Sequence, residues 1–355
     1  MDRIDDNGWQ VDAWLADDWA AVDPEYPRLL ALLNKRRAGQ SWHKHATFRD
    51  HLVGVYRMLK LWRQDRETCL CGLFHSVYSN EYVDLALFDP HEGRDVLANE
   101  IGADVERTIH RFCTIPRTAF VLALLDERTD CREGITLDRN GETFELSPRE
   151  VVLFLVVTLA DLVEQWYSWQ EDTMASYPHT GRLDAQPNWA VTLWPGPFRP
   201  GSSALSLASR LARHLRGLAE PVPPIFAQCT AHLDSADEAA AAALYWQVAT
   251  LQMPLVDREH ARGMLARAVE MNPWVGEPHL MLAQIDLVSG RFEDAEQHAG
   301  RGLALLRDWG IQWDKRVSWE GWVVWASMLA QRARLREWPG TLRDFNNLGL
   351  VTRDA

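Results

Sequence analysis

SPREVVLFLVVTLADLVEQW, residues 147–166, is the stretch that decides the fold. Ser147 and Pro148 supply a helix cap and a proline at the first helical position, and Glu150 stands where it completes a capping box. From Val151 onward the stretch is apolar on nearly every side, which is typical of a helix buried in the centre of its domain. The sequence therefore predicts an all-helical protein in which this helix is the core of the first domain.

Asp161 lies inside this hydrophobic helix. An unpaired carboxylate there would cost several kcal/mol or be forced to protonate, so Asp161 needs a partner. That partner could be an arginine or a lysine, but the apolar faces of the neighbouring helices carry few basic residues and two histidines, His51 and His75. A single histidine on an apolar face is more often a core residue than a ligand. Two imidazoles and one carboxylate together predict a divalent metal site.

Three amphipathic helices are expected before the central one. Apolar residues recur at helical spacing in three segments, 48–62, 70–77 and 97–112. The exception to helix is ITLDRNGETFEL, residues 135–146, where Asn140 and Gly141 separate two short alternating runs. That arrangement predicts a small β-hairpin with a type I′ turn.

The length of 355 residues predicts two domains. Residues 177–202 are rich in proline, glycine and isolated aromatics, so we expect an ordered loop that packs over the first domain. A helix at 203–217 then precedes a proline cluster, which is the predicted boundary. The expected domains are residues 1–219 and 225–355.

The second domain carries an internal repeat with a shift of 34 residues. Ala249 and Ala261 recur as Ala283 and Ala295, small residues at points where two helices approach closely. The period resembles that of tetratricopeptide repeats, and the segment is similar to about two degenerate repeats capped by further helices. Residues 309–338 are dense in tryptophan, which we expect to close the end of the solenoid in preference to lining a groove.

The overall charge disfavours polyanionic partners. The formal net charge is -13, so neither nucleic acid nor an anionic membrane surface is an expected partner. The first ten residues, MDRIDDNGWQ, lack the basic and apolar regions of a secretory signal, and no apolar run is long enough for a membrane span. We therefore expect a cytoplasmic protein whose five cysteines are reduced thiols.

The chain resembles the HD-domain superfamily, and most closely the alarmone (guanosine tetraphosphate) hydrolase domains. The resemblance covers about residues 40–170 and is carried by four segments, TFRDHLVGVYRMLKLW (47–62), CLCGLFHSVYSNEY (69–82), an I-G-x-x-V-E stretch (101–106) and LADLVEQ (159–165). It implies an HD-type helical bundle in which His51, His75 and Asp161 bind one metal. The 24-residue step from His51 to His75 agrees with the family.

The sequence departs from this family in the segment after His75. Ser76 stands where the family has its HD aspartate, and Ser79 and Asn80 stand where the alarmone hydrolases carry an acidic pair that handles the attacking water. Without the bridging aspartate a single ion is expected in place of a dinuclear site. Glu81, the next acidic residue, is the candidate general base, and Asn80 is the candidate for orienting the substrate.

Several further residues are candidates around the ion. Ser76, His45 and His110 are expected to contact either the ligands of the ion or the substrate. His43, His45, His91 or His110 could supply a fourth ligand, although each is more often a surface or loop histidine.

Three functions follow from these observations, and each involves a different use of the same fold. The leading hypothesis is a metal-dependent phosphohydrolase of HD type that acts on a nucleotide or another small phosphoester, with one divalent ion of Mn, Fe or Zn. The first alternative is a mononuclear non-haem Fe(II) oxygenase, because two histidines and one aspartate also form the facial triad of those enzymes. The second alternative is an inactive HD-derived scaffold whose tetratricopeptide-like half binds a protein partner.

Overall fold

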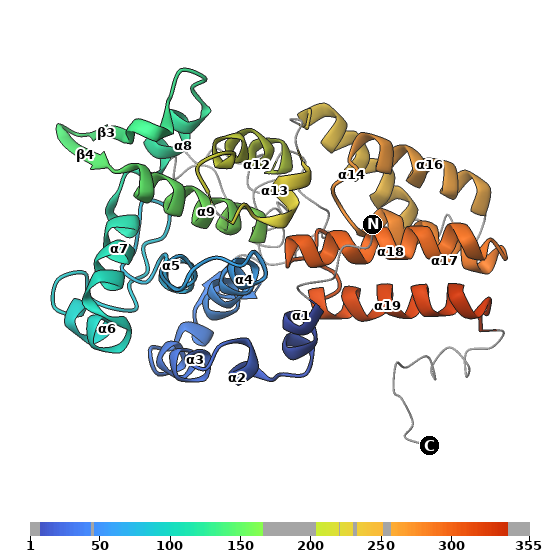
Figure 1. Ribbon diagram of the computed structural model, residues 1–355, viewed down its shortest axis with the longest axis horizontal. Helices are drawn as coiled ribbons and strands as arrows, with labels where there is room; N and C mark the ends of the chain where they lie inside the picture. The colour runs from blue at the N-terminus through green and yellow to red at the C-terminus, as the bar shows by residue number, and fades with distance from the viewer. Residues whose placement is uncertain are drawn as a thin grey trace, which may run out of the picture. The chain divides into compact units, whose positions relative to one another are not determined.

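The computed structural model describes residues 8–43, 46–165, 204–219, 221–229, 233–250 and 257–339. Within these ranges the protein is all-α, as the sequence predicts (Figure 1). It also has two small two-stranded sheets, of which the sequence predicted the one at residues 135–146. The expected loop at 177–202 lies outside the described residues. None of the helices in the described ranges combines the length and apolar character needed to cross a membrane.

The chain divides into two compact units. The first comprises residues 1–165 and 207–232, and the second comprises residues 166–206 and 233–355. The sequence predicted domains at 1–219 and 225–355.

The first unit is built mainly of short helices. They are α1 (Gly8–Leu15), α2 (Trp19–Val22), α3 (Tyr26–Lys35), α4 (Phe48–Leu61), α5 (Arg66–Phe74), α6 (Arg94–Ile101), α7 (Ala103–Thr114), α8 (Arg117–Leu125), α9 (Pro148–Glu164), α12 (Ala204–Ala212), which enters this unit at Leu207, and α13 (Pro224–Gln228). The strands are β1 (Trp42–His43), β2 (Ala46–Thr47), β3 (Ile135–Arg139) and β4 (Glu142–Leu146). The helix expected at 203–217 is α12 followed by a 3-10 turn, Arg213–Leu215.

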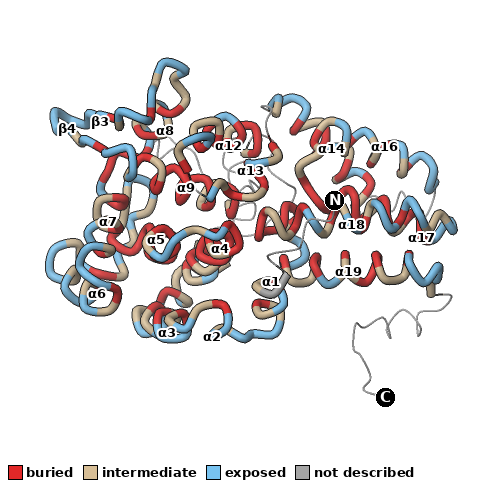
Figure 2. Tube along the Cα trace, viewed as in Figure 1, coloured by how far each residue is buried: buried red, intermediate tan, exposed pale blue. Residues whose placement is uncertain are grey.

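Helices α4, α5 and α9 pack against one another and form the core around the candidate site. Helix α9 is buried along most of its length (Figure 2), in agreement with its apolar sequence. Its start is confirmed, because the Ser147 side chain accepts from the Glu150 backbone N–H and the Glu150 side chain accepts from the Ser147 backbone N–H. Thr47 and Asp50 form the same reciprocal cap at the start of α4. Two of the three helices that position predicted ligands, α4 and α9, therefore have fixed starting points.

Helices α4 and α5 approach closely because Gly72 carries no side chain. A Cβ atom at this position would lie 2.1 Å from Leu59 Cδ1 and 3.1 Å from Val55 Cγ1. Both of those residues belong to α4 and are fully buried, so neither has free space to move into. The glycine thus lets α5 approach the helix that carries His51 and bring His75 beside it.

The predicted hairpin is confirmed at residues 135–146. Strands β3 and β4 are antiparallel, and their register runs from the pair Ile135 and Leu146 to the pair Arg139 and Glu142. Asn140 and Gly141 connect them with φ angles of 54° and 87°. Two consecutive residues with positive φ are what a type I′ turn requires.

The second unit contains longer helices that pack against their neighbours in sequence. They are α14 (Ser235–Thr250), α16 (Arg258–Met271), α17 (Glu277–Val288), α18 (Phe292–Trp309) and α19 (Trp319–Leu335). Helices α16 and α18 begin 34 residues apart. Ala261, Ala283 and Ala295 are fully buried, as close helix contacts require, whereas Ala249 is partly exposed. The relationship to tetratricopeptide repeats stays a prediction.

Most of the tryptophans in the 309–338 segment whose burial is described lie in the core of this unit. Trp309, Trp313 and Trp319 are each 1% exposed or less. The indole N–H of Trp319 donates to Leu306 O at 2.8 Å. Trp322 and Trp325 are less deeply placed and line a pocket of about 360 Å³. The described part of the segment therefore mainly fills the core, and Trp322 and Trp325 line this pocket.

The buried carboxyl of Glu277 makes the stability of the second unit depend on pH. Burial raises the pKa of Glu277 to about 7, although its Oε1 accepts from the backbone N–H groups of Trp313 and Asp314. Because this pKa lies above the ordinary value of 4.5, the stabilisation is complete below pH 4.5 and is lost as the pH rises through 7. Between pH 5 and pH 8 we expect the free energy of unfolding to fall by about 2.5 kcal/mol from this group.

Denaturant unfolding at several pH values tests this expectation. In the Glu277→Gln variant the amide can still accept from both backbone N–H groups but does not ionise. Between pH 5 and pH 8 the free energy of unfolding of the second unit is therefore expected to fall by about 2.5 kcal/mol less in the variant than in the wild-type protein. Equal pH dependence of the wild-type protein and the variant would contradict the assignment.

Candidate metal centre

His51 is held by a carboxylate on the far side of its ring. It lies on α4 with 2% of its surface exposed, and its Nδ1 is 2.6 Å from Glu164 Oε2. A carboxylate can only accept, so the proton of a neutral His51 ring belongs on Nδ1 and Nε2 carries a lone pair. This is the tautomer of a metal ligand that binds through Nε2, with the carboxylate orienting the ring from behind.

His75 is held in the same tautomer by the backbone. It caps the C-terminus of α5, is 1% exposed, and donates from Nδ1 to Gly72 O at 2.7 Å. Burial lowers the pKa of His75 more than the nearby carboxylate of Asp161 raises it, so the ring is neutral near pH 7. Its Nε2 therefore also presents a lone pair.

Asp161 faces both rings from α9. Its Oδ2 accepts from Arg117 Nη2 at 2.6 Å and its Oδ1 accepts from Gln165 Nε2 at 2.5 Å. Burial by itself raises the pKa of Asp161, but the nearby His75 and Arg117 outweigh burial and hold the pKa well below its usual value. Asp161 is consequently an ionised carboxylate.

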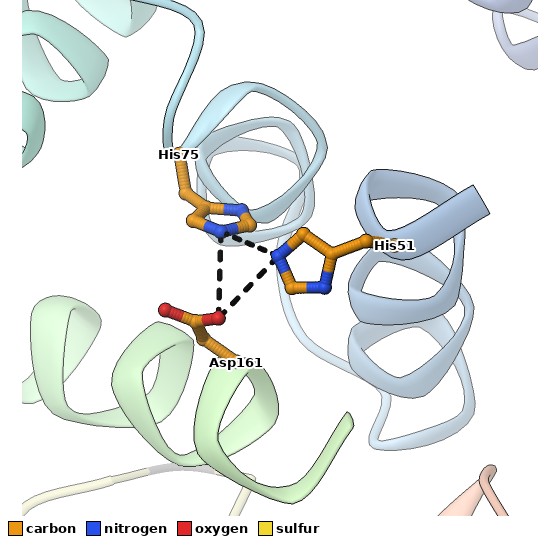
Figure 3. A group of neighbouring side chains, drawn as sticks. All are labelled: His51, His75 and Asp161. Atoms are coloured by element: carbon orange, nitrogen blue, oxygen red, sulfur yellow. Dashed lines mark hydrogen bonds and ion pairs between the residues drawn. The ribbon is translucent and has the colours of Figure 1, made fainter. Parts of the chain in front are cut away.

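The three predicted ligands converge on one point, as Figure 3 shows. The two Nε2 atoms are 3.1 Å apart, and Asp161 Oδ1 lies 3.4 Å from His51 Nε2 and 3.6 Å from His75 Nε2. All three atoms are acceptors in these protonation states, so their approach is unfavourable unless a cation lies among them. Gln165 Nε2 lies 3.3 Å from His51 Nε2 and can donate to it, which offsets only part of the repulsion among the three acceptor atoms. Two nitrogen donors and one carboxylate oxygen suit a divalent transition ion.

Among the proposed fourth ligands that the structure describes, His43 packs against the cluster. Its ring centroid lies 4.3 Å from that of His51, and its Nε2 is buried without a hydrogen-bond partner in the described part of the chain. Burial lowers the pKa of His43 to about 3, so the ring is neutral. The cluster of mutually close ligand atoms nevertheless contains His51, His75 and Asp161 alone among the described residues.

Two of the other histidines considered as fourth ligands, His91 and His110, lie elsewhere. His45 is outside the described residues. His91 is exposed, and His110 packs its ring against Tyr78 at a centroid distance of 5.5 Å. Neither His91 nor His110 joins the three ligands.

Ser76, Asn80 and Glu81 stabilise the loop that follows α5. Asn80 Nδ2 donates to Ser76 Oγ at 2.7 Å, and Asn80 Oδ1 accepts from the backbone N–H of Tyr82 at 2.8 Å. Glu81 Oε2 accepts from the Thr118 backbone N–H at 2.9 Å, at the start of α8. The loop is thereby linked to the helix that supplies Arg117, while Glu81 is not among the clustered ligand atoms of the described histidines and acidic residues.

Sequence reasoning missed three residues that support the ligands. Glu164 and Gln165 could have been found, because they follow Asp161 by three and four residues and so share its face of α9. Arg117 comes from α8, which no spacing in the sequence relates to Asp161. We expected the partners of Asp161 to be histidines and not an arginine or a lysine. This expectation was incomplete, because Asp161 contacts both Arg117 and the two histidines.

A model of one protein family matches residues 32–117, which include His51 and His75 but not Asp161. Its description is a domain of unknown function, DUF6817. No curated protein and no solved structure matches the chain.

Proposed function

We propose that the first unit is a mononuclear metal-dependent enzyme of HD type that hydrolyses a small phosphoester. The observation that carries the proposal is the approach of three acceptor atoms, one from each of His51, His75 and Asp161, with both imidazoles held in the tautomer of a ligand. A divalent ion of Mn, Fe or Zn, when bound there, would polarise a phosphoryl oxygen and lower the pKa of a bound water.

In this proposal some residues hold the metal ligands in position and others act on the water or the substrate. Glu164 and the Gly72 carbonyl hold the two rings in position, and Arg117 and Gln165 hold the carboxylate of Asp161. Such supporting contacts orient the ligands and tune the affinity for the ion. Glu81 stays our candidate for the general base and Asn80 for orienting the substrate, each by exchanging its present contact in the loop for one to water or substrate.

One observation also supports the oxygenase alternative. Ser76 stands in place of the carboxylate that bridges two metals in HD domains, and its Oγ accepts from Asn80. Two histidines and one aspartate then form the complete protein ligand set of a mononuclear Fe(II) oxygenase. The two enzymes differ in the ion they need and in their dependence on oxygen.

Metal analysis of the purified protein separates these functions. We expect about one divalent ion per chain, and hydrolysis of phosphoesters that a chelator abolishes and Mn²⁺ or Zn²⁺ restores. Stoichiometric iron with an oxygen-dependent spectral change would instead identify the oxygenase. A folded protein that takes up no metal would exclude both enzymes and favour the inactive scaffold.

A further inference from the structure

Arg117 is a buried cation beside the candidate metal centre. It is 5% exposed, and its guanidinium lies 4.6 Å from the centroid of the Phe112 ring and 5.7 Å from that of Tyr82. Contacts with two aromatic rings restrict the guanidinium more than a single ion pair would. Arg117 is therefore a pre-positioned charge.

Only part of the hydrogen-bonding capacity of this guanidinium is used. One of its five N–H groups donates to Asp161 Oδ2. No protein acceptor within the described ranges takes the other N–H groups. A planar guanidinium with free N–H groups suits a tetrahedral oxyanion or a carboxylate, which it can bind with two parallel hydrogen bonds.

The charge of the site also favours an anion. Both imidazoles are neutral ligands, and the carboxylates of Asp161 and Glu164 together balance a divalent ion. Arg117 then leaves the loaded site with one net positive charge in a buried setting. Asp161 lies between the ion and Arg117, because its Oδ1 faces the two imidazoles that would bind the ion and its Oδ2 accepts from Arg117.

We propose that Arg117 binds the phosphoryl group of the substrate next to the metal. The proposal rests on the metal-dependent function above and adds the residue that selects an anionic substrate. Inorganic phosphate is then expected to bind the metal-loaded protein and to bind the metal-free protein much more weakly.

Phosphate titrations of Zn²⁺-loaded protein test this. Arg117→Gln removes the charge, and we expect phosphate affinity to fall about 10- to 100-fold, as for loss of a charge-assisted hydrogen bond. Arg107→Gln is the matched control, because it removes an exposed arginine of the same unit and is expected to change phosphate affinity less than twofold. Metal content is measured for each protein, so that loss of the ion is recognised.

A second readout keeps the proposal testable if Arg117→Gln takes up no metal. In ¹⁵N-arginine-labelled, Zn²⁺-loaded protein, the guanidinium resonances of Arg117 are expected to shift in proportion to bound phosphate. Phosphate that binds without shifting them overturns the proposal, as does equal phosphate affinity of loaded wild-type protein and Arg117→Gln. If the Zn²⁺-loaded protein does not bind phosphate, the role proposed for Arg117 is overturned but the metal site is not. If the protein binds no metal, both the metal site and the role of Arg117 are overturned.

Discussion

Asp161→Asn is expected to weaken binding of Mn²⁺ or Zn²⁺ by more than about 100-fold while the protein stays folded. The amide keeps the size of the side chain and can still accept from Arg117, but it is a poor metal ligand and carries no charge to balance the ion. Asp161→Ala is expected to lose the metal as well and to lower the free energy of unfolding of the first unit by about 3 kcal/mol. The additional loss arises because Arg117, which is 5% exposed, is left buried without its anion.

Metal affinity by calorimetry and unfolding by denaturant separate the two effects. Asp104→Asn is the matched control, since Asp104 is an exposed aspartate of the same unit whose ion pair with Arg107 lies at the surface. If Asp161 were only a buried structural residue, Asp161→Ala would reduce stability and the remaining protein would still bind metal normally. That result would remove the metal site from the protein.

Local sequence signals predicted the parts of the structure that depend on local chemistry. The start of α9 follows from a serine, a proline and a glutamate within four residues, and the hairpin turn follows from Asn140 and Gly141. The grouping of His51, His75 and Asp161 was also predictable, because a carboxylate inside an apolar helix needs partners and the neighbouring apolar faces carry few polar side chains. An acidic residue within a strongly apolar stretch was thus the most informative signal in the sequence.

Contacts between distant segments could not be predicted in the same way. Arg117 meets Asp161 across 44 residues of sequence, and the meeting depends on how α8 is placed against α9. His43 packs against His51 because a two-residue strand precedes α4, and such a short strand has no periodic signal. The chemistry of Asn80 and Glu81 likewise depends on the path of a loop, which their spacing alone does not define.

Glu164 is expected to set the metal affinity of His51 without touching the ion. Its Oε2 holds the Nδ1 side of the ring at 2.6 Å and fixes the tautomer that leaves Nε2 free for the metal. Glu164→Gln can still accept this hydrogen bond through its carbonyl, so we expect about 10-fold weaker binding of Mn²⁺. Glu164→Leu removes the acceptor, so His51 can adopt the other tautomer, and about 100-fold weaker binding is expected.

Gly54→Ala tests the same contact from the opposite helix and without changing any polar group. A Cβ atom at Gly54 would lie 3.0 Å from Glu164 Cγ and 3.2 Å from its Oε1, so the carboxylate has to move away from its present place. Alanine also favours helix over glycine by up to about 1 kcal/mol, which limits the loss of stability from this crowding in α4. We therefore expect Gly54→Ala to weaken metal binding about 10-fold, with much less change in the unfolding transition measured without metal. Glu164 has no part in the site if both Gly54→Ala and Glu164→Leu bind Mn²⁺ as tightly as the wild-type protein, since crowding and removal then have no effect on His51.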